Sequence, residues 1–206
     1  MNALQRKEAH MEQIITIRDA GLTYQARNGE VEALRGVTFS VAEGEFVSIV
    51  GPSGCGKSTL LGVLAGLETL DSGTAALRGS AISGPNRLVG FMPQRDQLFE
   101  WRTIRDNVML GLELRRDRDP VHRRHAEALL ARYGLAEFAD KRPDQLSGGM
   151  RQRCALIRTL ATGPDILLLD EPFSALDYQT RLAVSGDIWR IIRGEGKTAL
   201  LVTHDI

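Results

Sequence analysis

The sequence predicts an α/β fold with an antiparallel β layer, a mostly parallel core sheet flanked by helices, and an α-helical subdomain. Short β-branched or alternating runs separated by Gly and Asn predict the antiparallel layer at 14–17, 22–24, 31–33 and 37–41. Continuous apolar runs predict strands buried on both faces at 46–50, 166–169 and 198–202. A helical pattern follows each of the first two apolar runs, and this alternation indicates a parallel sheet with crossover helices.

The helical subdomain is expected at about 95–163, inserted in the core. Three helical patterns lie in it, at 104–114, 121–133 and 148–161. The second has Asp119 as its N-cap and Pro120 at its first helical position. The charged stretch 115–124 is expected to be a solvated turn and helix face, with a nucleic-acid patch as the less favoured alternative.

A last helical pattern at 179–193 lies between the second and third apolar runs. It places four residues on one face, Leu182, Ser185, Trp189 and Ile192. We therefore expect a single domain over residues 1–206.

Composition excludes several classes of protein. The chain has 206 residues, with 26 Lys and Arg against 26 Asp and Glu, and this neutral balance does not favour a nucleic-acid partner. Its two cysteines, Cys55 and Cys154, are far apart and match no zinc-binding spacing, which favours a reducing, cytoplasmic location. The first dozen residues lack the apolar stretch of a secretion signal, and no apolar run approaches the roughly 18 residues that cross a bilayer. Any membrane role is therefore expected to come through a partner.

A glycine-rich segment directly after the apolar run 46–50 has the pattern of a phosphate-binding loop. Its residues are Gly51, Pro52, Ser53, Gly54, Cys55, Gly56, Lys57, Ser58 and Thr59. Glycines let successive backbone amides converge on a phosphate, and a helix N-terminus adds a favourable partial charge. Lys57 is expected to neutralise the β- and γ-phosphates of a nucleotide, and the Ser58 hydroxyl to bind Mg2+, which takes oxygen ligands. The alternative is a glycine-rich turn that binds no phosphate.

Two carboxylates, Asp170 and Glu171, follow the apolar run 166–169. They are expected at the carboxyl end of a strand, where open α/β sheets bind ligands. Asp170 is expected to hold Mg2+ through water, and Glu171 to act as the general base on the attacking water. Taken alone, the segment also fits a simple turn before a helix, and the phosphate loop favours the catalytic interpretation.

A second anion-binding helix end is predicted at 146–150. Ser147 is a natural N-cap, and Gly148 and Gly149 would leave backbone amides uncovered. Because the phosphate loop already holds the nucleotide of its own chain, we expect Ser147, Gly148, Gly149 and Met150 to face a nucleotide held by another copy. An ordinary capped helix is the alternative.

Together these motifs resemble those of the ATP-binding cassette ATPases of ABC transporters, from about residue 14 onward. The glycine-rich loop is similar to the Walker A motif, 146–150 to the signature, 166–172 to the Walker B strand, 174–177 to the D-loop, and His204 to the switch histidine. The motifs also occur in the order of that family. The resemblance implies a P-loop ABC ATPase fold, ATP and Mg2+ as cofactors, and hydrolysis of ATP to ADP and phosphate.

The resemblance also implies roles for single residues. Tyr24 matches the aromatic residue that stacks on adenine, although a lone Tyr also fits ordinary strand packing. Gln94 matches the Q-loop glutamine, which touches Mg2+ and the attacking water and links the site to the membrane subunit. His204 would contact the γ-phosphate and help hold Glu171 and the water. Asp177 would communicate across a dimer interface, although it also fits the N-cap of the next helix.

The implied partners are a second cassette in an active homodimer, integral membrane permease subunits and, indirectly, an extracytoplasmic solute-binding protein. The chain would then lie on the inner face of the cytoplasmic membrane. The segments 91–108 and 171–178 are similar to the nitrate/sulfonate/taurine importer branch, and thiamine-precursor importers look much the same. Glu100 stands where that branch often has Pro, so the substrate is weakly specified.

Two other departures from the family pattern matter. Met150 stands where many members have Gln, which removes one side-chain amide from the signature. The chain ends at Ile206, two residues past His204, where the family usually continues with a strand and a helical tail. We expect either a domain cut short after the switch histidine or a naturally short chain, with a mobile His204 and weaker hydrolysis.

Two other functions compete with transport. The first is a non-transport ABC ATPase of DNA repair, chromosome structure or translation, but no coiled coil, zinc module or second cassette is present in the sequence. The second is a nucleotide-binding regulator with little turnover.

Overall fold

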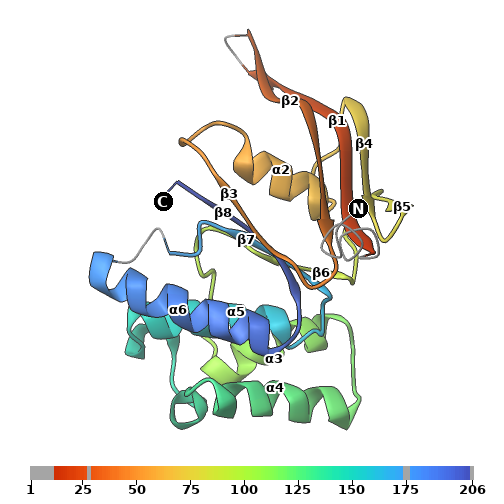
Figure 1. The fold of residues 1–206 in the computed structure, drawn as a ribbon. Coiled ribbons are helices and arrows are strands. Elements are labelled where there is room, and N and C mark those ends of the chain that lie inside the picture. Colours follow the sequence, from red (N-terminus) through yellow and green to blue (C-terminus); the bar gives the residue numbers. More distant parts are fainter. Residues whose placement is uncertain (1–11, 27–28, 174–176, 205–206) are drawn as a thin grey trace, which may run out of the picture.

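The computed structural model describes residues 12–26, 29–173 and 177–204, and it contains two four-stranded sheets (Figure 1). The antiparallel sheet has the order β2-β1-β4-β5 and comprises β1 (Gln13–Ala26), β2 (Gly29–Ala42), β4 (Ser72–Leu77) and β5 (Ser80–Ala81). The parallel sheet has the order β3-β8-β7-β6 and comprises β3 (Phe46–Val50), β6 (Val89–Met92), β7 (Ile166–Asp170) and β8 (Thr198–Thr203). The predicted combination of an antiparallel layer and a parallel core sheet is confirmed.

Helices cover both faces of the parallel sheet. They are α2 (Lys57–Leu64), α3 (Ile104–Leu114), α4 (Pro120–Arg132), α5 (Gly148–Leu160) and α6 (Tyr178–Gly194), with short 3-10 turns at Ala136–Phe138 and Pro143–Gln145. Helix α2 lies between the two sheets, and α3 to α6 lie on the opposite side of the parallel sheet (Figure 1). Asp119 caps α4 by accepting a hydrogen bond from the Val121 amide, as predicted. The division into one domain with an inserted helical subdomain stays a prediction.

The core strands β7 and β8 separate two apolar clusters. Because successive side chains of a strand point to opposite faces, one set packs with α2 and the antiparallel sheet: Ile166, Leu168, Leu200 and Val202. The alternate set packs with α3 to α6: Leu167, Leu169, Ala199 and Leu201. The continuous apolar runs thus reflect burial on both faces, and the predictions for β7 and β8 are confirmed.

The same prediction for β3 is wrong. Phe46 is 38% exposed and Val50 is 47% exposed, whereas Val47 and Ile49 pack against the cluster beneath α2. The cause is the strand order, in which β3 is the first strand of the described sheet and pairs only with β8. An apolar run therefore did not distinguish an edge strand from a central one.

The face of α6 that packs on the core is not the face shared by Leu182, Ser185, Trp189 and Ile192. Val184, Ile188, Ile191 and Ile192 are buried, whereas Leu182 and Trp189 are exposed. Of the four residues expected to share a face, only Ile192 is in the buried set. Trp189 instead lies beneath the guanidinium of Arg193, with 5.1 Å from Arg193 Cζ to the ring centroid, a distance suited to a cation–π contact.

Parallel pairing brings the carboxyl ends of the core strands to one edge. Val50 pairs with Thr203, Val202 with Asp170, and Leu169 with Met92. Each of the four strands is followed at this edge by a segment with a predicted functional residue. This edge is where ligands bind in open α/β sheets.

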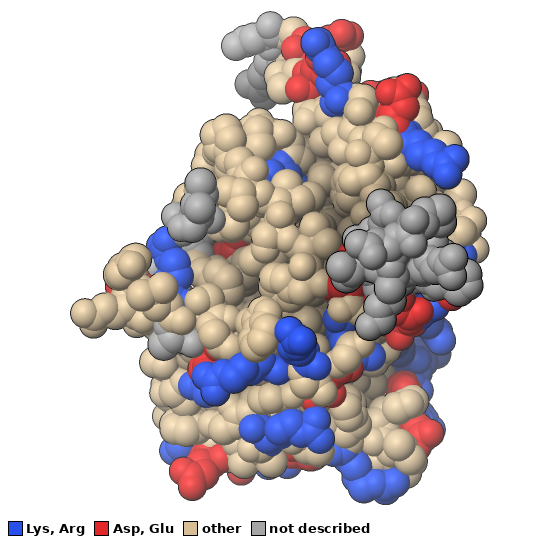
Figure 2. Space-filling view, in the orientation of Figure 1, with Lys and Arg blue, Asp and Glu red and all other residues tan. Residues whose placement is uncertain are grey.

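The charged side chains are unevenly distributed over the surface. On the face drawn in Figure 2, Lys and Arg side chains gather over the lower, helical part, with acidic side chains among them. Charged side chains also lie at the top and upper right of that face, and the surface between them and the lower part is mostly uncharged. Within the described ranges, no helix has the length and apolar character to span a membrane.

The two-cluster core predicts a contrast between buried and exposed leucines. Leu168→Ala removes a fully buried side chain from the centre of β7 and should lower the free energy of unfolding by about 2–5 kcal/mol. Leu114→Ala, at an exposed end of α3, should change it by less than about 0.5 kcal/mol. Denaturant unfolding followed by circular dichroism measures both, and equal losses would contradict the assigned core.

Candidate functional site

The glycine-rich loop joins the end of β3 to the start of α2. Gly54 and Gly56 have positive φ angles of 80° and 93°, which side chains other than hydrogen rarely permit. Gly56 is the N-cap of α2, and a Cβ added there would lie 2.1 Å from the carbonyl oxygen of Ala33. The loop therefore packs against the antiparallel sheet so closely that only glycine fits. Its following helix end offers the unpaired amides that bind phosphate.

Lys57, the first residue of α2, has its ammonium at the centre of this loop. The residue is only 7% exposed, and Nζ donates to the carbonyl oxygens of Gly51 and Pro52 at 2.7 Å each. Cys55 Sγ lies 3.8 Å from the same Nζ. Because burial of an unpaired charge is costly, an anion bound in the loop would be a favourable partner for this ammonium.

Ser58 links the loop to the end of β7. Its Oγ donates to Asp170 Oδ1 at 3.0 Å. Burial raises the pKa of Asp170, the Ser58 hydrogen bond opposes this shift, and the nearby Glu171 carboxylate adds to it. A hydroxyl and a carboxylate oxygen are the ligands that Mg2+ takes, usually completed by phosphate oxygens and water. The donor set therefore fits Mg2+, and a cation would offset the repulsion between the two neighbouring carboxylates.

Glu171 is held from both sides by residues that follow two other core strands. Gln94 Nε2 donates to its Oε2 at 3.0 Å, and His204 Nδ1 lies 3.0 Å from its Oε1. Glu171 itself has a φ of 42°, a strained conformation for a non-glycine residue. Three residues predicted to act on one water thus meet in space, although Gln94 and Glu171 are 77 residues apart in the chain.

A hollow of about 360 Å³ lies beside the loop. Ser53, Gly54 and 56–59 of the loop line it, and so do Gln94 and Glu171. Tyr24, Val31 and Ala33 of the antiparallel hairpin line it as well, and Tyr24 is 38% exposed. Val31 and Ala33 were expected only as strand residues. Their part in the site follows from the pairing of Val31 with Tyr24, which a strand prediction alone does not contain.

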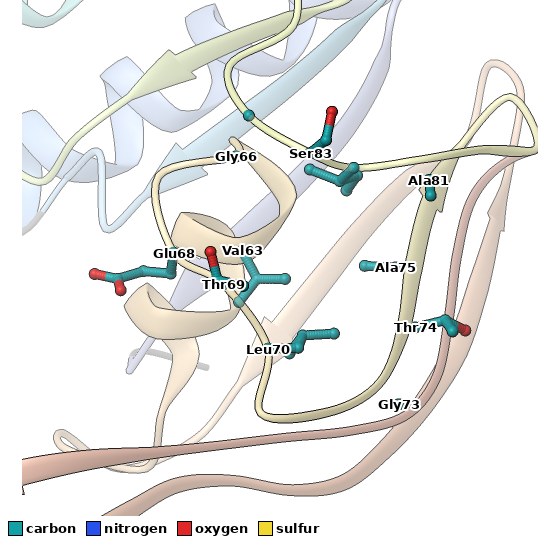
Figure 3. Close-up of a pocket in the computed structure, with 12 residues that line it drawn as sticks. Val63, Gly66, Glu68, Thr69, Leu70, Gly73, Thr74, Ala75, Ala81 and Ser83 are labelled. Carbon is teal, nitrogen blue, oxygen red and sulfur yellow. The ribbon is translucent and has the colours of Figure 1, made fainter.

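A second hollow of about 270 Å³ lies between the end of α2 and the β4–β5 hairpin (Figure 3). Its labelled residues include Val63, Leu70 and Ala75, with hydroxyls from Thr69 and Ser83. Glu68 is the charged residue among the described lining, which includes no Lys or Arg. This chemistry does not suit a nucleotide phosphate, so the hollow at the loop is the better candidate.

The residues of 146–150 lie outside the hollow at the loop. Ser147 caps α5, with its Oγ accepting a hydrogen bond from the Met150 amide at 3.3 Å. Ser147 and Gly148 are exposed, but Gly149 is buried, and a Cβ there would lie 2.7 Å from Cγ2 of Val184. Gly148 is therefore exposed at the predicted helix end, whereas Gly149 is buried and serves the close packing of α5 on α6.

Comparison with known proteins decides the family. Residues 34–174, more than half of the chain, match the family described as ABC transporter. The chain belongs to the ABC transporter family. It is therefore an ABC ATPase, and the fold and activity implied by its motifs are confirmed.

Three relatives illustrate the position of the chain within the ABC transporter family. It is 41% identical to the taurine import ATP-binding protein TauB of Ruegeria pomeroyi, over 93% of this chain and 72% of that protein. It is 49% identical to the aliphatic sulfonates import ATP-binding protein SsuB 2 of Agrobacterium fabrum, over 85% of this chain and 65% of that protein. The dimeric, post-hydrolysis structure of the ATP-binding cassette MJ0796 with ADP and Pi matches with a TM-score of 0.78 and 33% identity, over 93% of this chain and 88% of that chain.

The D-loop of this ABC ATPase is described only in part. Asp177 is exposed, and its Oδ1 accepts a hydrogen bond from the Thr180 amide at 3.1 Å, so it is the N-cap of α6. This confirms the capping interpretation, and its role at a dimer interface stays a prediction. Ser174, Ala175 and Leu176 lie outside the described residues.

The close approach at Gly56 leads to a test of nucleotide binding. Gly56→Ala should destabilise the native loop by on the order of 1–3 kcal/mol, because Ala tolerates neither the positive φ nor the contact with the Ala33 carbonyl. ATP affinity should fall with it. Gly84→Ala is the control, because a Cβ there would meet nothing within 4 Å. Titration with a fluorescent ATP analogue measures both variants, and wild-type affinity in Gly56→Ala would contradict the loop assignment.

Proposed function

We propose that this ABC ATPase binds ATP with Mg2+ at the hollow beside the glycine-rich loop and powers the import of a small anionic or zwitterionic solute. The observation that carries the proposal is the convergence of the Lys57 ammonium with the Gln94–Glu171–His204 cluster on one edge of the parallel sheet. A phosphate-binding cation and a restrained carboxylate next to each other are what hydrolysis of a nucleoside triphosphate needs.

The proposed roles at the nucleotide follow from the contacts. The loop 51–59 binds the phosphates through its backbone N–H groups, which Pro52 lacks, Lys57 neutralises their charge, and Tyr24 stacks on the base. Ser58, Gln94 and Asp170 would hold Mg2+, which when bound supplies further neutralisation of phosphate charge. Glu171 accepts a proton from the attacking water, while Gln94 and His204 fix the direction of its two carboxylate oxygens.

A second copy is proposed to complete each site. Ser147 and Gly148 are exposed at the N-terminus of α5 and do not line the hollow of their own chain. They are therefore free to face a nucleotide on a partner, with Met150 beside them and Gly149 holding α5 close to α6. The dimeric MJ0796 cassette supports this arrangement. Asp177 would lie at the interface between the two copies.

The substrate class comes from the relatives. TauB and SsuB 2 are named for import of taurine and aliphatic sulfonates, and a bicarbonate transport ATP-binding protein is also 47% identical over 86% of this chain. Among the expected substrates, taurine and sulfonates have this support, and nitrate and thiamine precursors have none from the three relatives. Permease subunits would hold the chain at the inner face of the cytoplasmic membrane, with a solute-binding protein on the other side.

The assigned base has a direct test. Glu171→Gln keeps the shape and the contact with Gln94 but cannot accept a proton, so turnover should fall by about 10²–10⁴-fold. ATP affinity should be unchanged, and the dimer should persist because bound ATP is not consumed. Phosphate release, ATP titration and size-exclusion chromatography measure the three effects.

The matched control is Glu68→Gln, which changes a carboxylate at the other hollow and should leave turnover unchanged. Wild-type turnover in Glu171→Gln would refute the assigned base.

The transport function needs its own test. A strain that lacks the gene should lose growth on taurine or an alkanesulfonate as sulfur source, or lose bicarbonate uptake. Wild-type protein should restore the lost function, and Glu171→Gln should not, because import requires hydrolysis. A deletion strain that takes up all three solutes at the normal rate would rule out this substrate class.

A further inference from the structure

The segment that carries Gln94 is tied to the signature helix α5 by a forked ion pair. Arg151 Nε donates to Asp96 Oδ2 at 2.8 Å, and Arg151 Nη2 donates to Asp96 Oδ1 at 3.2 Å. The same Nη2 donates to Glu100 Oε1 at 2.7 Å. The guanidinium of Arg151 thus binds two carboxylates, those of Asp96 and Glu100, in the segment that follows β6 and Gln94.

A second arginine of α5 holds the backbone of the same segment. Arg158 Nη2 donates to the carbonyl oxygen of Asp96 at 2.6 Å, and Nη1 donates to that of Gln97 at 2.7 Å. Arg158 is partly buried, and burial lowers its pKa. Gln97 has a φ of 47°, so the segment is kept in a conformation that costs free energy without such support.

The Arg151 contact differs from an ordinary surface ion pair. The side chains of Arg151 and Asp96 are 25% and 18% exposed, so solvent screens their attraction less than at an open surface. Burial alone would raise the pKa of Asp96, but hydrogen bonds from Arg151 and the Leu98 amide outweigh it and hold that pKa below its usual range. Removal of Arg151 would leave a half-buried carboxylate without its main partner, which is costly.

The far end of the segment is fixed independently. Asn107, fully buried on α3, accepts a hydrogen bond from the Phe99 amide at 2.7 Å and donates to the Phe99 carbonyl at 3.1 Å. Between this clamp and Gln94, Leu98 is buried in the core and its amide donates to Asp96 Oδ1 at 3.1 Å. The two arginines of α5 hold Asp96 and Gln97, the contacts on this side of Leu98 that lie nearest to Gln94. The position of Gln94 against Glu171 therefore depends on α5.

Arg151 is also attached directly to the signature. It lies in the first turn of α5, where its backbone amide donates to the Ser147 carbonyl at 2.9 Å. One residue thus bonds to the exposed helix end through its backbone and to the Gln94 segment through its side chain. A displacement of the N-terminus of α5 would therefore reach the Gln94 segment through the side chain of Arg151.

We propose that Arg151, together with Asp96 and Glu100, is a positioning residue that couples the signature of one chain to the Gln94–Glu171 contact of the same chain. The proposal rests on the proposed function, in which Ser147 faces the partner's nucleotide and Gln94 faces the chain's own. Nucleotide at one site of the dimer then orients the catalytic groups at the other, and the coupling is reciprocal for binding. Glu100 supplies the second carboxylate that Arg151 binds.

A double-mutant cycle in the full-length chain tests the coupling. Arg151→Gln and Asp96→Asn should each lower kcat for ATP hydrolysis by about 10- to 100-fold, because a small misplacement of a catalytic group has effects of this size. KM for ATP and ATP affinity should stay within about twofold, because neither residue lines the hollow beside the loop. The double variant should be no slower than the slower single variant, since both changes break the same contact.

Two further variants separate positioning from general stability. Arg105→Gln removes an ion pair of similar length between α3 and α4, with 2.6 Å from Arg105 Nη1 to Glu127 Oε1, and should leave kcat unchanged. Arg151→Lys keeps the positive charge but not the planar guanidinium that binds Asp96 through two nitrogens. Its kcat should therefore lie between those of Arg151→Gln and the wild type. If Arg151→Gln does not fold, the same cycle is run with Arg151→Lys and the milder Glu100→Gln.

The outcomes distinguish this proposal from the proposed function. The kcat of Gln94→Ala is measured in parallel. If Gln94→Ala lowers kcat but Arg151→Gln does not, or if the effects of Arg151→Gln and Asp96→Asn on kcat are additive, the coupling is overturned and the proposed function stands. Normal turnover in both Gln94→Ala and Glu171→Gln would overturn the function itself. The coupling is supported if the losses in kcat are non-additive, KM for ATP is unchanged and Arg105→Gln has wild-type kcat.

Discussion

The site depends on the register of the four parallel strands, because the register determines where their carboxyl ends lie. Hydrogen bonds between neighbouring strands set Val50 opposite Thr203 and Asp170 opposite Val202, so the segments that follow β3, β6, β7 and β8 meet at one edge. A slip of β7 by one residue would turn its side chains to the opposite faces of the sheet. It would bury Asp170 in an apolar cluster and break its hydrogen bond to Ser58. The two clusters on either side of β7 thus protect the catalytic geometry as well as stability.

The antiparallel sheet restricts the same site from the other side. Gly56 approaches the Ala33 carbonyl so closely that a Cβ there would lie 2.1 Å from its oxygen, so the glycine-rich loop is packed directly on strand β2. Tyr24 pairs with Val31 across the hairpin, and both residues line the hollow. The hairpin therefore has two functions, since it fixes the loop and also provides the wall on which a base could rest.

Features that local sequence determines were predictable, and features that depend on neighbours were not. The glycine-rich loop, the Asp119, Ser147 and Asp177 caps and the central strands β7 and β8 each follow from a few adjacent residues. Whether β3 has a neighbour on its outer side is a property of the whole sheet, and an apolar run does not contain it. The buried face of α6 likewise depends on where α5 lies. The fork of Arg151 joins residues 55 positions apart and requires a defined side-chain geometry, so no spacing in the sequence indicates it.

The backbone of Glu171 explains how two adjacent carboxylates acquire different tasks. In a regular strand, Asp170 and Glu171 would point to opposite faces of the sheet. The positive φ of Glu171 ends the strand and directs its carboxylate toward Gln94 and His204, while Asp170 stays beside Ser58. One oxygen of the Glu171 carboxylate is then held by His204, which follows β8, and the other by Gln94, whose segment is tied to α5. Because the orientation of the carboxylate depends on both contacts, a shift of α5 would change it, which makes α5 the element through which a second copy controls hydrolysis in the proposed mechanism.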